Sequence, residues 1–282
     1  MSKVFKTSHR LLRRFTAKPA VTVGQLIVML AAVTLITITI NNKNINFDRS
    51  NSLQAVKTVK PKVKFLNAST ETTTTKTAKH KTTLAFEQYK PRYTAIAIHP
   101  SNYGDRHAVD VNGNVLTNRP IVVLHETTNS AVSAINTFRN ANLSDRSQVS
   151  YHALIALDGT IVYLVASDKR AFGAGNSAFI GDEGVETVQT NPNLPSSVNN
   201  FAYHVSLETP VDGRGNSSRS HSGYTDNQYK SLAWLLTLTD VPDNRITTHE
   251  NVDRSGARFD PRSFDFDKLL TILRSYRQPI VN

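Results

Sequence analysis

The chain has 282 residues, of which 39% are hydrophobic, so it is long enough to bury a core and lacks the composition of a disordered protein. It contains no cysteine, which excludes a disulfide scaffold, a thiolate zinc finger and a cysteine nucleophile. Its net charge of +11 comes from residues 1–91, with 16 Lys and Arg against 3 Asp and Glu, whereas residues 92–282 hold 17 against 19. The second part is close to neutral, so we expect no nucleic-acid partner for it.

The first 40 residues have the pattern of a membrane anchor. Residues 1–19 carry six basic and no acidic residues, and residues 20–40 carry no charge. As a helix, the uncharged segment would span about 30 Å, the thickness of the hydrocarbon core. The basic flank predicts a cytoplasmic tail at 1–19, a single-pass inner-membrane anchor at 20–40 and an exported, extracytoplasmic remainder. A cleaved signal peptide is the alternative, although the segment ends in Thr39-Ile40 rather than in small residues.

Residues 41–91 are polar and rich in Lys and Thr, with a threonine run between residues 70 and 77. This composition buries too little apolar surface to offset chain entropy, which predicts a flexible linker with a reach on the order of 40 Å. A linker that adheres to anionic lipid or an acidic polymer is the alternative. The exported domain is then expected at 92–282.

From residue 92 onward, strand and helix signals alternate as in one α/β domain. The sequence predicts a hairpin at Asn112-Gly113, within residues 109–116, and a second at Asp158-Gly159, flanked by strands at 150–157 and 160–165. Further strands are expected at 121–124 and 201–208. Helices are expected from Asn129 to about residue 140, after a Thr225/Gln228 capping box as far as Pro242, and from about 264 to 274.

Three residues have the types and positions of a catalytic metal site. His125 follows the apolar strand 121–124, His249 follows the short run 245–248, and Asp260 comes eleven residues later. Two neutral imidazoles and a carboxylate leave the fourth tetrahedral position of zinc open for water, as in catalytic rather than structural sites. The spacing therefore predicts that His125, His249 and Asp260 bind Zn²⁺.

Each of these histidines is followed by glutamate, as at the start of a His-Glu-x-x-His zinc helix. The fourth positions are Asn129 and Asp253, so neither copy is complete. Because neighbouring strand residues face opposite sides, we expect Glu126 and Glu250 to point away from the metal as surface or hydrogen-bonding groups.

Glu208 is the acid best placed to exchange protons with an activated water. It ends the strand 201–208, in which alternation places His204, Ser206 and Glu208 on one face. A carboxylate at the end of an apolar strand is expensive without a partner, which favours a site, but a solvated residue at a loop edge is the alternative.

Four segments resemble the zinc-dependent N-acetylmuramoyl-L-alanine amidases, a family that shares its fold with peptidoglycan recognition proteins and phage amidase-type lysozymes. They are 121–127, 149–155 with Asp158-Gly159-Thr160, 205–208, and 249–261 with its final Asp260-Pro261. The resemblance covers about residues 120–274.

The resemblance implies a central mixed β-sheet flanked by helices, with a peptide-binding cleft over one zinc. It assigns His125, His249 and Asp260 as ligands and Glu208 as the catalytic acid/base. Arg258 stands where the family usually has a lysine that stabilises the oxyanion. A Tyr-His pair of the phage members implies that Tyr151 and His152 line the cleft, and His204, on the face of Glu208, is a further expected substrate contact.

Two residues depart from the family pattern. Arg258 keeps the charge of the lysine but replaces a point charge with a planar fork. The family segment Trp-His-Ala-Gly reads Phe172-Gly173-Ala174-Gly175 here, so one histidine is absent.

The expected function is hydrolysis of the amide bond between N-acetylmuramic acid and L-alanine in peptidoglycan or muropeptides, by a domain that acts as a monomer. A domain that binds peptidoglycan without cutting it is the main alternative. A structural protein that binds metal is the other.

Overall fold

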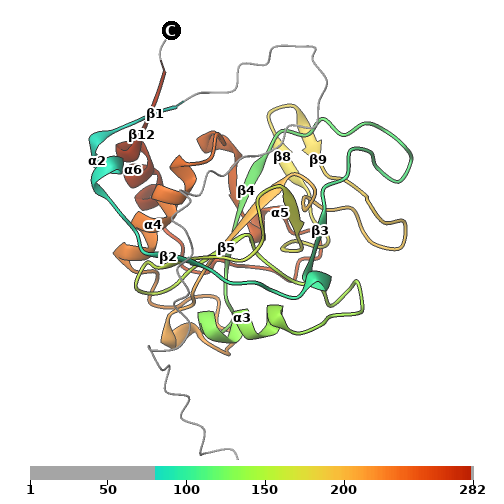
Figure 1. The fold of residues 1–282 in the computed structure, drawn as a ribbon, viewed down its shortest axis with the longest axis horizontal. Helices are drawn as coiled ribbons and strands as arrows, with labels where there is room; N and C mark the ends of the chain where they lie inside the picture. The colour runs from blue at the N-terminus through green and yellow to red at the C-terminus, as the bar shows by residue number, and fades with distance from the viewer. Residues whose placement is uncertain (1–79, 281–282) are drawn as a thin grey trace, which may run out of the picture. The chain divides into compact units, whose positions relative to one another are not determined.

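The computed structural model describes residues 80–280, and its centre is a six-stranded sheet (Figure 1). The strand order is β11-β4-β10-β5-β6-β2. Only the β5–β6 pair is antiparallel, so the mixed sheet predicted from the sequence is confirmed. The strands are β2 (Tyr93–Ala95), β4 (Ile121–Glu126), β5 (Ala153–Ile155), β6 (Ile161–Tyr163), β10 (Ala202–Leu207) and β11 (Ile246–Thr248).

Helices cover both faces of this sheet (Figure 1). Side chains alternate along β4 and β10, so Leu124 and Val205 pack in one cluster with Leu232 of α4 (Asp226–Thr237) and Leu269 of α6 (Phe266–Tyr276). On the opposite face, Leu154 of β5 packs against α3 (Ala131–Arg139). One face is therefore an apolar core, and the other also carries His125 and His204, which are fully buried.

The predicted helices form, with ends shifted by one or two residues except for α4, which ends at Thr237 and not at Pro242. The capping box is present at α4, where Thr225 accepts from the Gln228 backbone and the Gln228 side chain accepts from Thr225. Ser130, rather than Asn129, caps α3. Asp265 caps α6, which runs on to Tyr276.

The two predicted hairpins differ in outcome. At Asp158-Gly159, β5 and β6 pair antiparallel as expected. Around Asn112-Gly113 the chain also turns back on itself, with an antiparallel bridge between Val109 and Val115 in place of two full strands. The Asp110 carboxylate accepts from the backbone of Asn112 and of Asn114, which closes the turn.

Small elements fill the space around the central sheet. Two pairs of short strands are β3 (Tyr103–Asp105) with β7 (Lys169–Ala171) and β8 (Phe179–Gly181) with β9 (Gly184–Glu186). A four-residue helix, α5 (His249–Val252), follows β11, and single 3₁₀ turns lie at Pro100–Asn102, Val211–Gly213 and Asp243–Arg245.

The folded domain begins earlier than residue 92. β1 (His80–Thr82) pairs with β12 (Arg277–Pro279), and α2 (Leu84–Gln88) packs on α6. Phe86 stacks on Trp234 with ring centroids 5.8 Å apart. Residues 80–91 therefore belong to the domain and not to the predicted linker, because a few aromatic contacts and one strand pair hold them.

The remaining N-terminal predictions lie outside the described residues. These are the tail 1–19, the anchor 20–40 and the linker up to residue 79. Between His80 and Ile280, no helix combines the length and apolar character needed to cross a bilayer.

Candidate metal centre

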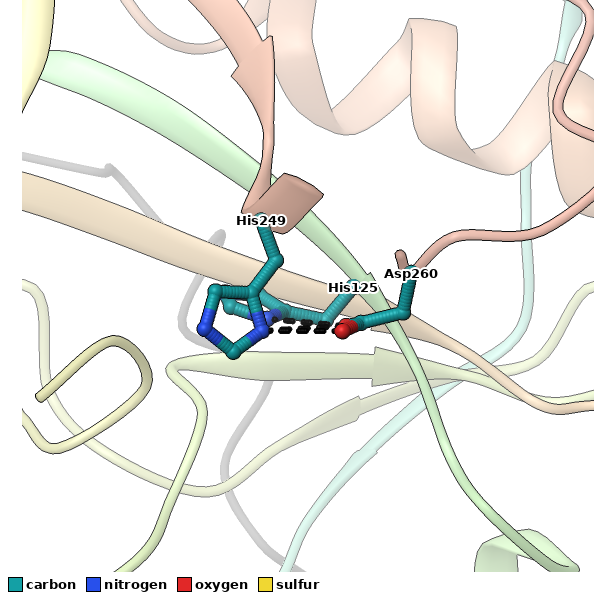
Figure 2. Close-up of side chains that lie close together, drawn as sticks. All are labelled: His125, His249 and Asp260. Atoms are coloured by element: carbon teal, nitrogen blue, oxygen red, sulfur yellow. Dashed lines mark hydrogen bonds and ion pairs between the residues drawn. The ribbon is translucent and has the colours of Figure 1, made fainter. Parts of the chain in front are cut away.

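Parallel pairing brings the three predicted ligands together at one edge of the sheet. β11 lies beside β4 with Thr248 opposite Leu124, so the next residues, His249 and His125, emerge side by side. Asp260 reaches them from the following loop, where its carbonyl accepts from the Glu250 backbone at 3.0 Å. Figure 2 shows the three side chains pointing toward one another.

The distances in this triad suit one shared ion. The possible ligand atoms of His125, His249 and Asp260 all lie within 4.8 Å of one another. Nδ1 of His125 is 3.4 Å from Oδ2 of Asp260, and Nδ1 of His249 is 3.0 Å from Oδ1. Ligands at about 2.0–2.1 Å from a tetrahedral zinc are themselves separated by about 3.3 Å.

The protonation states of the triad also suit a cation. Burial lowers the pKa of His125 to about 4, so its imidazole is neutral at pH 7. Burial alone would raise the pKa of Asp260, but the neighbouring imidazoles of His125 and His249 hold it well below its ordinary value. Nδ1 of His125 is buried without a hydrogen-bond partner and faces the Asp260 carboxylate. A metal ion between them would give both the nitrogen lone pair and the carboxylate a partner. The residues present therefore fit zinc.

Tyr151 and Arg258 lie beside the triad as expected. The Tyr151 ring is 4.8 Å from the His125 ring between centroids, and its side chain is partly exposed. Burial and the Asp260 carboxylate raise the pKa of Tyr151, so its hydroxyl remains a donor. Arg258 is exposed, and its charge contributes to lowering the pKa of His125.

Asp253 organises the loop that carries Arg258. Its carboxylate accepts from the backbone of Ser255, Ala257 and Arg258 and from the Ser255 hydroxyl. Burial raises the pKa of Asp253, but these hydrogen bonds outweigh it and hold the pKa below its ordinary value. From the sequence, Asp253 was noted only because it stands where a His-Glu-x-x-His helix would have its second histidine. The run Asp253-Arg254-Ser255-Gly256, a carboxylate shortly before serine and glycine, is the turn signal that could have found it.

His152 and His204 do not line an exposed surface, which corrects the expectation that they contact substrate. Both are fully buried. Nδ1 of His152 accepts from the His204 backbone at 2.9 Å, and Nε2 lies 3.1 Å from the Lys169 carbonyl. Alternation does place His204 on the metal side of β10, but under His125 rather than beside a substrate.

Within the part of the chain that the structure describes, Glu208 bonds to the scaffold and forms no hydrogen bond or ion pair with the triad. Oε1 accepts from the Ala131 backbone at 3.0 Å and from Nη2 of Arg214 at 2.9 Å, and Oε2 accepts from the Leu157 backbone at 3.0 Å. Ala131 is the first residue of α3, so the carboxylate also offsets the positive end of that helix. Glu208 is buried, so the alternative of a solvated residue at a loop edge is wrong, and the partners that a buried carboxylate needs are present.

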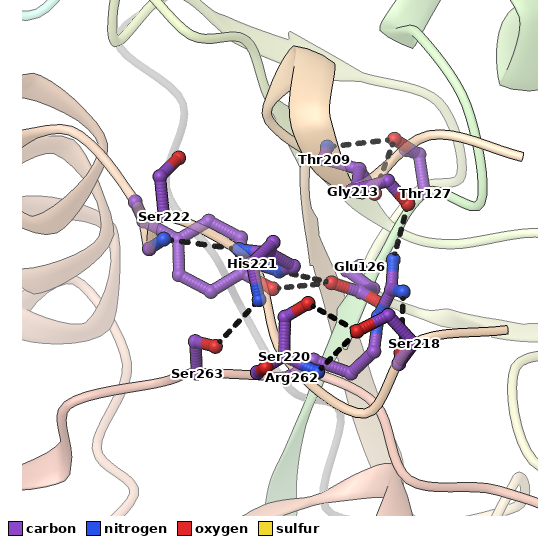
Figure 3. Close-up of polar contacts among 12 residues, drawn as sticks. Glu126, Thr127, Thr209, Gly213, Ser218, Ser220, His221, Ser222, Arg262 and Ser263 are labelled. Carbon is purple, nitrogen blue, oxygen red and sulfur yellow. Dashed lines mark hydrogen bonds and ion pairs between the residues drawn. The ribbon is translucent and has the colours of Figure 1, made fainter. Parts of the chain in front are cut away.

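Glu126 faces away from the metal, as alternation predicts, but it is buried rather than a surface charge. It pairs with Arg262 and accepts from the Tyr224 hydroxyl at 2.7 Å, and its Oε2 lies 2.9 Å from Nε2 of His221 (Figure 3). Glu126 follows one ligand and Arg262 comes two residues after another. The buried pair therefore joins the two segments that carry His125 and Asp260, a link that no local sequence pattern reveals.

Comparison with known proteins adds to this geometry. The profile of the N-acetylmuramoyl-L-alanine amidase family matches residues 117–263, about half of the chain. A search of curated proteins finds no match.

Solved structures of similar fold include AmpD of Citrobacter freundii and the amidase AmiD of E. coli. AmpD is 24% identical, with a TM-score of 0.39 over 65% of this chain and 90% of its own. AmiD is 19% identical, with a TM-score of 0.42 over 58% of this chain and 65% of its own. The match of the family profile spans all three residues of the triad, and the chain belongs to the N-acetylmuramoyl-L-alanine amidase family.

Proposed function

We propose that this protein is a zinc-dependent amidase that cleaves the bond between the lactyl group of N-acetylmuramic acid and L-alanine in peptidoglycan. The observation that carries the proposal is the convergence of His125, His249 and Asp260 within ligand distance of one another. The choice of this bond is based on membership of the N-acetylmuramoyl-L-alanine amidase family. Whether intact wall or a released muropeptide is the substrate is decided by assaying both.

The residues around the triad suit this reaction. When bound, zinc supplies Lewis acidity, which favours attack of water on a carbonyl at neutral pH. Hydrolysis joins the water oxygen to the lactyl carbonyl carbon, breaks the C–N bond and moves a proton to the leaving amine. Arg258 is exposed beside the triad and is always charged, so it stabilises the charge that develops on the carbonyl oxygen, a contribution on the order of 3 kcal/mol. The Tyr151 ring borders the triad on the His125 side, where it would flank a bound substrate.

Glu208 is the proposed proton carrier, and its contacts define how that role must be tested. Three donors engage its carboxylate, which leaves about one of its four lone pairs for proton transfer. Glu208→Gln also turns an amide group toward a backbone N–H, so it costs about 1–3 kcal/mol of stability whatever its effect on catalysis.

The test uses the purified full-length chain with zinc, cell-wall sacculi and defined muropeptides, and mass analysis of the products. The expected products are free stem peptides that begin with L-alanine. Glu208→Gln should lower turnover of the folded protein by about a hundredfold or more. Arg214→Gln is the matched control, because it removes the same ion pair and leaves the carboxylate. Equal, small losses in both variants would make Glu208 a purely structural residue.

One observation favours the alternative of a domain that binds peptidoglycan without cutting it, namely the engagement of Glu208 by three scaffold donors. That alternative predicts retention of the protein on sacculi with no new peptide in the mass spectrum. It also predicts that Arg258→Gln weakens binding without any turnover to lose.

We also propose that the domain works outside the cytoplasm, held at the inner membrane by residues 20–40. The support is the uncharged segment and its basic flank. Protease added to spheroplasts should degrade the domain, and removal of residues 1–40 from the coding sequence should leave it in the cytoplasm. A protease-resistant full-length chain in intact spheroplasts would contradict the proposal.

A further inference from the structure

Two buried imidazoles, those of His204 and His152, lie in series behind His125 of the metal triad. Nε2 of His125 is 2.9 Å from Nδ1 of His204, and the His204 backbone donates to Nδ1 of His152 at 2.9 Å. The rings of His204 and His152 are nearly parallel, 10° apart with centroids at 5.8 Å. All three side chains are fully buried, so no water competes for these contacts.

The contacts of each ring fix which nitrogen carries the proton. His152 accepts at Nδ1, so its proton is on Nε2, beside the Lys169 carbonyl. Nδ1 of His125 faces Asp260, and a nitrogen that binds a metal must be deprotonated. The His125 proton then belongs on Nε2, where Nδ1 of His204 is placed to accept a hydrogen bond from it. The proton of His204 is then on its own Nε2, which is buried without a hydrogen-bond partner among the described residues.

Gly173 makes the room that His204 needs. A Cβ at residue 173 would lie 2.5 Å from Nδ1 and 2.6 Å from Cγ of His204, closer than any real contact. Glycine here is one of the departures from the family pattern, and the structure gives it a physical reason. Position 173 has no side chain because the imidazole of His204 packs against its backbone.

From these contacts we propose that His204 is a positioning residue, which holds the His125 ring so that Nδ1 points at the metal. Nδ1 of His204 does this by accepting a hydrogen bond from Nε2–H of His125, as carboxylates and carbonyls do behind many metal-bound histidines. This inference rests on the proposed metal site and not on the amide bond that is cut. It assigns no substrate contact to His204.

The test compares two replacements of His204 in the full-length chain. His204→Phe keeps a ring but removes the acceptor, and His204→Gln keeps an acceptor. Zinc affinity, measured by competition with a chelator, should fall about 10–100-fold in His204→Phe and recover at least partly in His204→Gln. Selective ¹⁵N labelling of histidine in the zinc-free protein should show the Nε2–H form of His125 in wild type and a mixture of both forms in His204→Phe. Unchanged affinity and an unchanged tautomer in a folded variant would overturn the proposal.

Two glycines provide an independent route if His204→Phe fails to fold. Gly173→Ala pushes directly on the His204 ring and should weaken zinc binding. Gly175→Ala is the matched control, since a Cβ there meets nothing within 4 Å. Equal zinc affinities in these two variants would also overturn the proposal. A wild-type chain that binds zinc tightly but cuts no muropeptide would remove the proposed activity and leave the role of His204 standing.

Discussion

The two faces of the central sheet differ in what the same strands bury: apolar side chains on one face and histidines on the other. On the face under α4 and α6, Leu124, Val205 and Leu207 pack among apolar side chains, and stability comes from burial. On the other face, β4 and β10 bury His125 and His204, which need specific partners. Changes on the first face should therefore affect folding, whereas changes on the second should affect metal binding and protonation.

The largest expected effect is on the polar face. Asp260→Asn keeps the shape of the side chain but removes the only negative charge of the triad. We expect zinc binding to be lost and amidase turnover to fall roughly a thousandfold, since several kcal/mol of transition-state stabilisation depend on the metal. Zinc content and product formation are the measurements, with the exposed Asp240→Asn as control. Tight zinc binding by Asp260→Asn would contradict the assignment of Asp260 as a metal ligand.

On the apolar face, Leu232→Ala removes a fully buried side chain of α4. We expect the free energy of unfolding in urea to fall by about 2–5 kcal/mol, because the cavity is only partly filled by relaxation. Val132→Ala, at an exposed position of α3, should change it little. Zinc affinity of the folded Leu232→Ala protein should equal that of wild type, and a weaker affinity would show that the two faces are coupled.

The polar face should also make stability depend on pH. Burial lowers the pKa of His152 to about 3, against about 6.5 in an unfolded chain. The stability that goes with its neutral form is fully present above pH 6.5 and is lost as the pH falls toward 3, by up to about 1.4 kcal/mol per pH unit. His152→Asn, which does not titrate, should give a shallower slope of unfolding free energy between pH 7 and pH 5. Parallel slopes would mean that this imidazole is not the source.

The smallest expected effect concerns the start of α4. Thr225→Ala removes the side chain that accepts from the Gln228 backbone and should cost about 1 kcal/mol in unfolding free energy. Thr225→Ser retains the acceptor and should cost less. A loss in Thr225→Ala above that of Leu232→Ala would contradict the ranking of burial over capping on this face.

Local pattern was sufficient for the elements that build the site. Alternation along 201–208, the apolar run at 121–124 and the Thr225 capping box all describe neighbours in sequence, and β4, β10 and α4 confirm them. His125 and His249 were predicted because each follows a strand, and the parallel pairing of β4 with β11 brings these two strand ends to one edge, whereas Asp260 was predicted from its place in the following loop.

Contacts between distant segments were not predictable in this way. The donors to Glu208 come from residues 131, 157 and 214, and the partner of Glu126 lies 136 residues away. Several strands have only three residues, too few for a period to be visible. The N-terminal boundary was misplaced for the same reason, since α2 has five residues and its aromatic partner is Trp234.

The pairing of β1 with β12 places His80 opposite Pro279, so the two ends of the described chain leave from one corner of the domain. That corner packs with α6, on the face that does not hold the triad. In a chain limited to residues 80–280, a short peptide joining these two ends would therefore allow circular permutation, with new termini opened in an exposed turn such as the one at Gly113. A label or surface attachment placed at either end of that shortened chain would lie away from the imidazoles.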